Sequence, residues 1–544
     1  MSNGIFTPPI PVNEPIKNYA PQSEEKRLLK LAIAELESSC YDIPVIIDGK
    51  EYRSGNTAEL RSPSDHKRCF GRYHVASPEQ LTMAIAAAQK AKKQWSDLPW
   101  VDRASIFLKA AELLSGSWRY KINAATMLGQ GKTVYQAEID SACELIDFLR
   151  FNATYMSQIY SDQPQINSKG VWNRLEYLPL EGFVLAITPF NFTAIGGNLP
   201  TAPAMMGNTV LWKPASSAVL SAYLVMQLLK EAGLPDGVIN FVPCSGREIS
   251  KQAVEHIDLA GIHFTGSTET FGHIWRTIGD NIRKYRIYPR LVGETGGKDF
   301  LVAWNDIDVP ALVTACVRGA FEYQGQKCSA LSRAYFPKSR WAEIRPLLEA
   351  TVASIKMGDV NDFTNFMSAV IDRNSFENIK SFIEDARNSS EAEIICGGSC
   401  NDAEGYYVQP TVIVAHNPRF RTMCEEIFGP VLTIFIYDDE CLDETLELID
   451  KTSPYALTGA IFAKDRYVIS RMMRALEHSA GNFYINDKPT GAVVGQQPFG
   501  GSRGSGTNDK AGSKINLLRW VTIRTIKETF EPPVAIGYPH MSEE

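Results

Sequence analysis

Four short apolar runs between residues 182 and 265 constrain the fold of this chain more than any other feature. They read GFVLAI (182–187), TVLWK (209–213), VINFV (238–242) and GIHFT (261–265), and segments with helical spacing lie between them. Continuous apolar runs of this length are typical of strands that are buried on both faces. Strands that alternate with helices form parallel sheets with helices on both sides, so these residues predict a doubly wound α/β domain.

A second series of the same kind starts at residue 300. Its apolar runs are FLVAW (300–304), RAYF (333–336), PVLTIFIY (430–437) and TGAIFA (458–463), with a further strand pair near Ile394 and residues 408–414. A chain of 544 residues is also too long to fold around one hydrophobic core. We therefore expect an α/β protein with two doubly wound α/β domains in tandem.

The other segments are expected to lie outside the two sheets. Residues 1–22 carry five prolines and little periodicity, which favours an extended arm. Helices are expected at Ser23–Ser38 and at Pro78–Trp95, where SPEQ has the spacing of a capping box, with a hairpin at 45–53 between them. Residues 167–181 and 515–527 look like strands outside both sheets, and exposed strand edges invite pairing between chains. The expected units are the arm with the first domain (1–166 and 182–293), the second domain (294–514), and a small β flap with the tail (167–181 and 515–544).

Charge and cysteine usage exclude several classes of protein. The net charge is −7 and the pI is about 5.8, so no basic surface favours nucleic acid or an anionic membrane as a partner. Ten cysteines are scattered without CxxC pairs, which argues against a metal site or a disulfide framework. No apolar run approaches the roughly 20 residues that span a bilayer. The first residues lack signal-peptide and transit-peptide character, so we expect the cytoplasm, or the mitochondrial matrix if a transit peptide has been removed.

Cys328 is the residue that most strongly indicates chemistry. It follows a helical pattern (309–321) and the break Gly325-Gln326, and it precedes an expected strand, so its thiol can face a cleft. Lys327 beside it would favour the thiolate, which is the nucleophilic form. A free cysteine is more often a small buried hydrophobe than a nucleophile, so this segment alone favours a buried, non-catalytic cysteine.

Four blocks of sequence together resemble the aldehyde dehydrogenase superfamily. They are TPFNF (188–192), GETGGK (293–298), the segment around Cys328, and EEIFGP (425–430), and they occur in the order found in that family. The resemblance implies that Cys328 attacks the aldehyde carbon, that the Asn191 amide and the Cys328 N–H hold the oxyanion, and that Glu294 is the general base. Thr295 replaces the leucine that is commoner after this glutamate.

The same resemblance implies NAD as cofactor. Lys213 follows a strand and would reach ribose hydroxyls, while Gly266 and Ser267 end a strand and open a helix whose N-terminus suits a pyrophosphate. Glu426 would bind the nicotinamide ribose and Phe428 would flank the ring. Thr188, Pro189 and Phe190 belong to the motif that borders the cofactor. Gly272 lies one residue further along than in many relatives, and a preference for NAD over NADP is inferred only from the branch of the superfamily.

The segments around Cys328 and FGGSRGSGTNDKAG (499–512) look closest to the branch that oxidises glutamate γ-semialdehyde, the open form of 1-pyrroline-5-carboxylate, to glutamate. This resemblance implies a carboxylate anchor at Ser329 and at Ser505-Gly506-Thr507. Glu144 would meet the α-ammonium, and Phe192 with Phe499 would line the aliphatic part of the tunnel. A homodimer or larger homo-oligomer is expected, with the flap at its interface.

Three alternatives remain open at this point. The chain could oxidise another semialdehyde or an aliphatic aldehyde, it could transfer the acyl group to coenzyme A, or it could be a non-catalytic relative. The last would be expected to lack the thiol or the base, and Cys328, Glu294 and Asn191 are all present.

Overall fold

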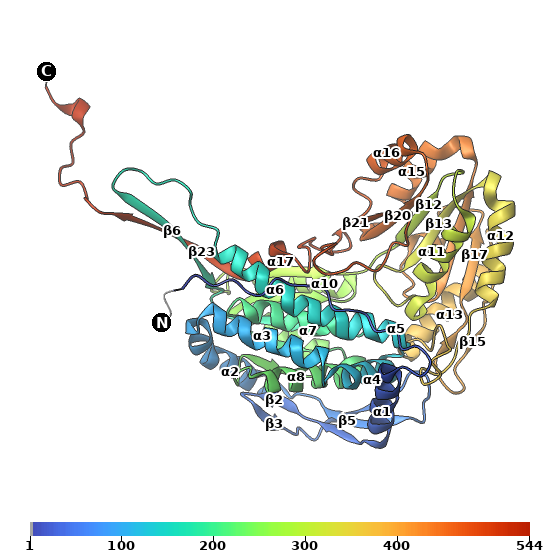
Figure 1. Cartoon of the computed structure of the whole chain (residues 1–544), viewed down its shortest axis with the longest axis horizontal. Coiled ribbons are helices and arrows are strands. Elements are labelled where there is room, and N and C mark those ends of the chain that lie inside the picture. The colour runs from blue at the N-terminus through green and yellow to red at the C-terminus, as the bar shows by residue number, and fades with distance from the viewer. Residues whose placement is uncertain (1–3, 544) are drawn as a thin grey trace.

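The computed structural model describes residues 4–543, and two seven-stranded sheets form its core (Figure 1). The first sheet has the order β11-β10-β7-β8-β9-β2-β3, in which β7 to β11 are parallel and the hairpin β2–β3 is added antiparallel at one edge. Its strands are β2 (Val45–Ile47), β3 (Lys50–Tyr52), β7 (Phe183–Ile187), β8 (Thr209–Lys213), β9 (Ile239–Phe241), β10 (Leu259–Thr265) and β11 (Arg290–Glu294). The predicted strands and the predicted hairpin are present.

Helices cover both faces of this sheet because each has one apolar face that must be buried. They are α1 (Glu24–Ser38), α2 (Pro78–Asp97), α3 (Trp100–Ser115), α4 (Arg119–Gln130), α5 (Val134–Ala137), α6 (Glu144–Tyr160), α7 (Thr193–Met205), α8 (Val219–Ala232), α9 (Gly246–Ile249) and α10 (Thr268–Asp280). The predicted capping box at the start of α2 is confirmed. Between α5 and α6, residues Glu138–Cys143 form a π-helix, a wider turn that recurs at functional sites.

The second sheet has the order β14-β17-β18-β13-β12-β20-β21 and is parallel except for β14. Its strands are β12 (Asp299–Ala303), β13 (Leu331–Pro337), β14 (Ala392–Cys396), β17 (Thr411–Ala415), β18 (Val431–Tyr437), β20 (Thr458–Phe462) and β21 (Asn482–Ile485). Its helices are α11 (Val309–Phe321), α12 (Lys338–Ala353), α13 (Arg373–Asn388), α14 (Arg421–Cys424), α15 (Leu442–Lys451) and α16 (Arg466–Ala475). The first sheet ends at Glu294 and the second starts at Asp299, so we propose the domain boundary between them.

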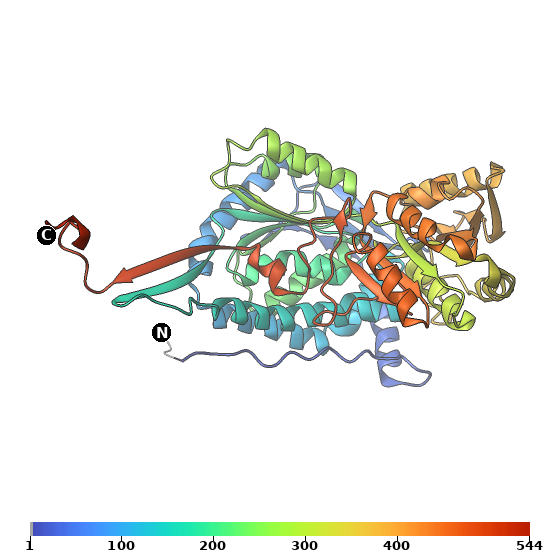
Figure 2. The same cartoon turned by 90° about the horizontal axis from the view of Figure 1, so that it is seen from above.

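A two-stranded ribbon projects from the body of the protein (Figures 1 and 2). It pairs β6 (Val171–Pro179) with β23 (Val521–Thr529) in antiparallel register, as expected for strands outside both sheets. The prediction of one strand over 515–527 is wrong in its first part, because Lys514–Leu518 forms the short helix α17. Ser513 caps that helix by accepting a hydrogen bond from the N–H of Ile515, and Leu517 is buried, so the local cap and burial decide the conformation.

Residues 4–22 form the expected extended arm, which runs alongside the helices of the first domain (Figure 2). A small sheet of β1 (Tyr41–Ile43), β5 (Cys69–His74) and β4 (Thr57–Arg61) lies outside the two main sheets. In the first main sheet, β7, β8, β10 and β11 are parallel neighbours, so their carboxyl ends meet at one edge. That edge is where ligands bind in open α/β sheets.

Candidate active site

A tight turn after α11 positions Cys328. The turn contains Tyr323, Gln324 and Gly325, whose φ values are +51°, +55° and +65°. A Cβ at Gly325 would lie 2.2 Å from the carbonyl oxygen of Gly429, so this position requires glycine. Cys328 follows three residues later and is half-buried.

Asn191 lies close to the turn that carries Cys328, as the family resemblance implied. Its Nδ2 donates to the Gln326 carbonyl oxygen at 3.0 Å, and the side chain is buried. An amide carries two N–H donors, so one remains for another acceptor. The strand end after β7 and the loop before β13 are thereby joined at the site.

The expectation that Lys327 favours the thiolate is wrong. Burial raises the pKa of the Cys328 thiol well above its usual value, and the carboxyl groups of Asp299 and Glu294 raise it further. The Lys327 ammonium lies 3.3 Å from the carboxylate of Asp140, so its charge is already paired. Cys328 therefore needs a base to remove its proton.

Glu294 is the last residue of β11 and supplies a buried carboxyl group beside this thiol. Its Oε2 is buried and has no hydrogen-bond partner in the described part of the chain. Burial raises the pKa of this carboxyl group well above the usual value, although the Gly501 N–H and the Lys510 ammonium oppose that shift. Perturbed carboxyl groups of this kind are typical of general bases.

The residues predicted to bind a cofactor gather along the same edge. Glu426 accepts from the Gly297 N–H at 2.9 Å, and burial raises its pKa to about 7. The rings of Phe190 and Phe428 meet edge to face with centroids 5.8 Å apart. The Lys213 ammonium is largely buried, its pKa is lowered by that burial, and it donates to the Pro214 carbonyl oxygen at 3.4 Å.

The start of α10 completes this edge. Ser267 caps the helix by accepting from the Thr270 N–H, and the Gly266 N–H donates to the Glu294 carbonyl oxygen at 3.2 Å. Directly after the neighbouring strand β7, the Thr188 hydroxyl accepts a hydrogen bond from Trp212 Nε1 at 3.1 Å, and Pro189 follows. The loop after β7 and the N-terminus of α10 are thus fixed from both sides.

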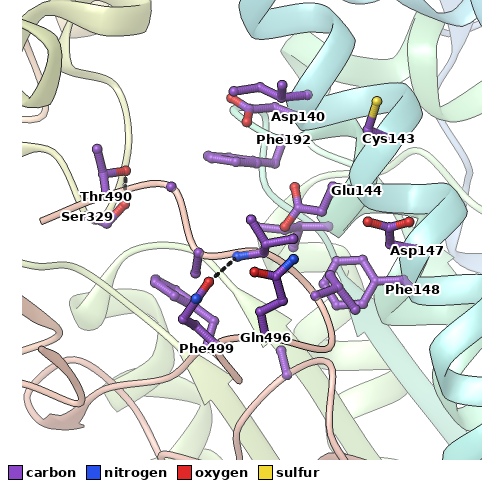
Figure 3. A pocket seen from close by; sticks show the side chains of 18 of the residues that line it. Asp140, Cys143, Glu144, Asp147, Phe148, Phe192, Ser329, Thr490, Gln496 and Phe499 are labelled. Carbon is purple, nitrogen blue, oxygen red and sulfur yellow. Dashed lines mark hydrogen bonds between the residues drawn. The ribbon is translucent and has the colours of Figure 1, made fainter. Parts of the chain in front are cut away.

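A cavity of about 390 Å³ adjoins Cys328 (Figure 3). Glu144 and Asp147 of α6 line one side, while Ser329 faces Thr490 at 2.7 Å between their hydroxyl oxygens. Ionisable side chains of both signs and aromatic rings line the rest: Asp140, Lys327, Lys488, Phe148, Phe192 and Phe499. The sequence-predicted residues Glu144, Phe192, Ser329 and Phe499 therefore meet in one space.

Glu144 is the unusual member of this group. Its Oε2 is buried and has no hydrogen-bond partner among residues 4–543, and burial raises its pKa well above the usual value. Nearby, Asp140 forms ion pairs with Lys132 and Lys327, and both ammonium groups lie over the Phe192 ring, at 4.2 and 5.7 Å from its centroid. A positively charged ligand group would relieve the burial penalty of Glu144.

Ser505, Gly506 and Thr507 lie elsewhere, so the predicted anchor at these residues does not fit the structure. Ser505 is fully buried and its Oγ accepts from the Ala456 N–H at 3.1 Å, while Gly506 forms a β-bridge with Glu294. The Thr507 N–H donates to the Gly293 carbonyl oxygen at 2.9 Å. These residues therefore contact the backbone of Gly293 and Glu294 and do not line the cavity.

Sequence reasoning missed two groups that do line the cavity. They are the loop Thr490–Val494 with Gln496, and the arm residues Asn13, Glu14 and Ile16. Neither group has a periodic pattern, and only the fold brings the arm to residues almost five hundred positions away. The small-residue run 490–492 was the one available signal.

Comparisons with known proteins agree with this geometry. Residues 51–526 match the aldehyde dehydrogenase family. The chain is 55% identical, over 98% of its length and 96% of the relative's, to a protein of Dictyostelium discoideum named delta-1-pyrroline-5-carboxylate dehydrogenase, mitochondrial. It is 47% identical, over 97% and 94%, to the human protein of that name.

Solved structures of proteins with this name have the same fold as this chain. The delta-pyrroline-5-carboxylate dehydrogenase of Mycobacterium tuberculosis, in a structure bound with NAD, superposes with a TM-score of 0.96 at 50% identity over the whole of both chains. A 1-pyrroline-5-carboxylate dehydrogenase from Thermus with bound NAD superposes with a TM-score of 0.90 at 31% identity, over 96% of this chain and 100% of the other.

Proposed function

Because the chain belongs to the aldehyde dehydrogenase family, we propose that it oxidises L-glutamate γ-semialdehyde, formed from 1-pyrroline-5-carboxylate, to L-glutamate with NAD, in proline catabolism. The names of its relatives support this reaction. The observation in the chain itself that carries the proposal is the cavity, where the unpartnered Glu144 carboxyl and the Ser329–Thr490 pair share a space with Cys328.

The residues along the carboxyl edge fit NAD. The buried Lys213 ammonium has a carbonyl oxygen at 3.4 Å and suits the hydroxyls of a ribose. Gly296 leaves room beside Glu426, since a Cβ there would lie 2.2 Å from the Glu426 Oε2. Phe190 and Phe428 would border the nicotinamide, and Ser267 at the start of α10 would face the pyrophosphate.

Glu294 would begin the chemistry by taking the Cys328 proton, because the raised pKa of the thiol keeps it protonated near neutral pH. The sulfur then bonds to the aldehyde carbon, and the free Asn191 N–H with the Cys328 backbone N–H would hold the resulting oxyanion. NAD, when bound, accepts a hydride from that carbon, which leaves a thioester on Cys328. Glu294 would first release the proton taken from Cys328 to solvent. It would then take a proton from a water molecule as that water attacks the thioester, and Cys328 would leave as the thiolate with the carboxylic acid as product.

The polar lining of the cavity suits a ligand that carries an ammonium group and a carboxylate next to each other, as an amino acid does. Glu144 would pair with the α-ammonium, and this cation would lower the pKa of that carboxyl group. The Ser329 and Thr490 hydroxyls and the backbone of Gly491 would face the carboxylate, with Phe192 and Phe499 along the methylene groups. An aliphatic aldehyde would leave Glu144 without a partner, which disfavours that alternative.

Assembly and location complete the proposal. The exposed edge and side chains of the β6–β23 ribbon, with Trp172 and Ile523 about half exposed, favour pairing with a second copy of the chain. In the part of the chain that the structure describes, no helix is long and apolar enough to cross a bilayer. Several relatives are named as mitochondrial, in agreement with the matrix alternative of the location prediction.

The test is NADH formation from the purified protein with 1-pyrroline-5-carboxylate, and separately with succinate semialdehyde and propanal, each with NAD and with NADP. The proposal expects the first substrate with NAD to give the highest kcat/KM. Cys328→Ala should bind NAD and give no turnover. Equal or better rates with the other aldehydes would contradict the proposed substrate, and turnover by Cys328→Ala would contradict the nucleophile.

A further inference from the structure

Residues 4–22 of the N-terminal arm form neither helix nor strand, yet polar contacts fix this segment to the first domain. The Glu14 carboxylate forms ion pairs with Arg119 at 2.6 Å and Arg150 at 2.8 Å. Further along, the Lys17 N–H and the Tyr19 hydroxyl donate to the buried carboxylate of Glu138, at 2.9 and 2.6 Å. The arm is therefore a fixed part of the first domain.

Asn13 makes contacts of a different kind, because they join two separate walls. Its Nδ2 donates to Asp147 Oδ2 on α6 and to the Val494 carbonyl oxygen, both at 2.8 Å. Its Oδ1 accepts from Gln496 Nε2 at 2.9 Å. Both N–H donors of the amide are used, so Asn13 links α6 to the loop that carries residues 490–496.

Both elements line the cavity. Glu144 and Asp147 lie on the α6 side and Thr490 lies on the opposite side, while Gln496 of the same loop lies between them near Phe148 (Figure 3). The loop also holds Thr490 against Ser329, so a shift of the loop moves the groups that would face a substrate carboxylate. The width between Glu144 and Thr490 thus depends on the bridge.

The ion pairs of Glu14 and the contacts of Glu138 hold the arm to the helices α4 and α6 and to the π-helix, but they do not reach the loop. Anchoring of the arm and bridging of the walls are therefore carried by different residues. A substitution at Asn13 therefore removes the bridge to the loop and leaves the anchoring contacts of the arm in place.

We propose that Asn13 is a positioning residue for the substrate. It fixes the spacing between α6 and the 490–496 loop, and this spacing favours a short aldehyde whose charged groups can contact Glu144 on one side and Thr490 on the other. This inference rests on the proposed function. Asn13 does not touch the reacting atoms, so its loss should weaken substrate binding and leave the chemical step intact.

The experiment compares Asn13→Ala and Asn13→Asp with wild type, using 1-pyrroline-5-carboxylate and propanal. Asn13→Asp keeps the volume but replaces the donor by a carboxylate that faces Asp147. Loss of these part-buried hydrogen bonds should raise the KM for the semialdehyde about fivefold to fiftyfold in both variants, with kcat within about twofold. The KM for propanal, which lacks the charged groups, should change less than about twofold. The control Ile5→Ala, at a fully exposed arm position, should match wild type.

Several results would overturn the proposal. An unchanged KM in either Asn13 variant would do so, as would an equal rise for propanal or a fall in kcat at constant KM. Thermal unfolding checks that the variants are folded. If they do not fold, Gln496→Ala breaks the same bridge from the loop side, and an unchanged KM for the semialdehyde in that variant would also contradict the proposal. If wild type does not oxidise the semialdehyde at all, the proposed function itself fails, which is a separate outcome.

Discussion

Replacement of Glu294 by glutamine tests the proposed base with little structural change. Glutamine has nearly the same volume, and its side-chain oxygen can still accept from the Gly501 N–H, which at present contacts the Glu294 carboxyl. A Cβ at Gly500 would lie 2.9 Å from Glu294 Oε1, so the pocket around this side chain is narrow and holds glutamine in the same place. The variant loses only the ability to take a proton.

The expected effect is large because two steps need the same base. General base catalysis contributes about 10²–10⁴-fold to a rate, which corresponds to roughly 3–5 kcal/mol in the barrier. The Cys328 thiol, with its raised pKa, also needs Glu294 for the first attack. We therefore expect kcat to fall by about 10²–10⁴-fold, with no rapid burst of NADH before the steady state.

The pH profile gives an independent check. Burial raises the pKa of Glu294, and its active form is the deprotonated one, so kcat/KM of the wild type should rise with pH as this carboxyl ionises. Glu426→Gln is the matched control, since it changes a second buried carboxyl group in the same way; it should raise the KM for NAD and lower kcat far less than Glu294→Gln does. A loss of less than about tenfold in Glu294→Gln would refute the role of the base.

Two further predictions concern stability. Burial lowers the pKa of His263 to about 4 from its usual 6.5, so the stability that its neutral form contributes is complete above pH 6.5 and is lost as the pH falls toward 4. Between pH 7 and 5 the free energy of unfolding of the wild type should fall by roughly 2 kcal/mol more than that of His263→Gln, measured from urea midpoints. An equal pH dependence of the two proteins would contradict this. Glu138→Gln leaves the buried Arg119 guanidinium with the Glu14 carboxylate as its remaining countercharge, so it should cost about 3 kcal/mol, the lower end of the range for breaking a buried ion pair. It should also make residues 4–22 sensitive to limited proteolysis, and an unchanged urea midpoint would count against the network.

The fold could be predicted from the sequence because each buried strand is a short continuous apolar run between helical patterns. Strands buried on both faces are typical of parallel sheets. Their carboxyl ends therefore bring Glu294, Lys213 and Ile187 to one edge. The family motifs identified the thiol, the base and the amide. Their positions at strand ends and in the loop before β13 agree with that interpretation.

The carboxylate anchor could not be placed from the sequence, because two small-residue loops lie close together and both offer hydroxyls and N–H groups. Ser505 and Thr507 follow the two-residue strand β22 (Ser502–Arg503), which pairs back with β19 (Tyr455–Ala456) and directs them toward Glu294. Residues 490–492 face the cavity instead. The charge state of Cys328 could not be predicted from the sequence either, because it depends on the burial of the thiol and on the ion pair between Lys327 and Asp140.

The π-helix at residues 138–143 sets the rotational phase of everything that follows it in α6. Successive residues of a helix are turned by about 100° around its axis, so a single residue more or less changes the direction of every later side chain. In the wide turn, Glu138 points to Arg119 and the arm while Asp140 points to the two lysines, and Glu144 and Asp147 then face the cavity. Deletion of one residue from this turn would bring a different stripe of α6 to the cavity, so the turn determines which side chains can meet a substrate.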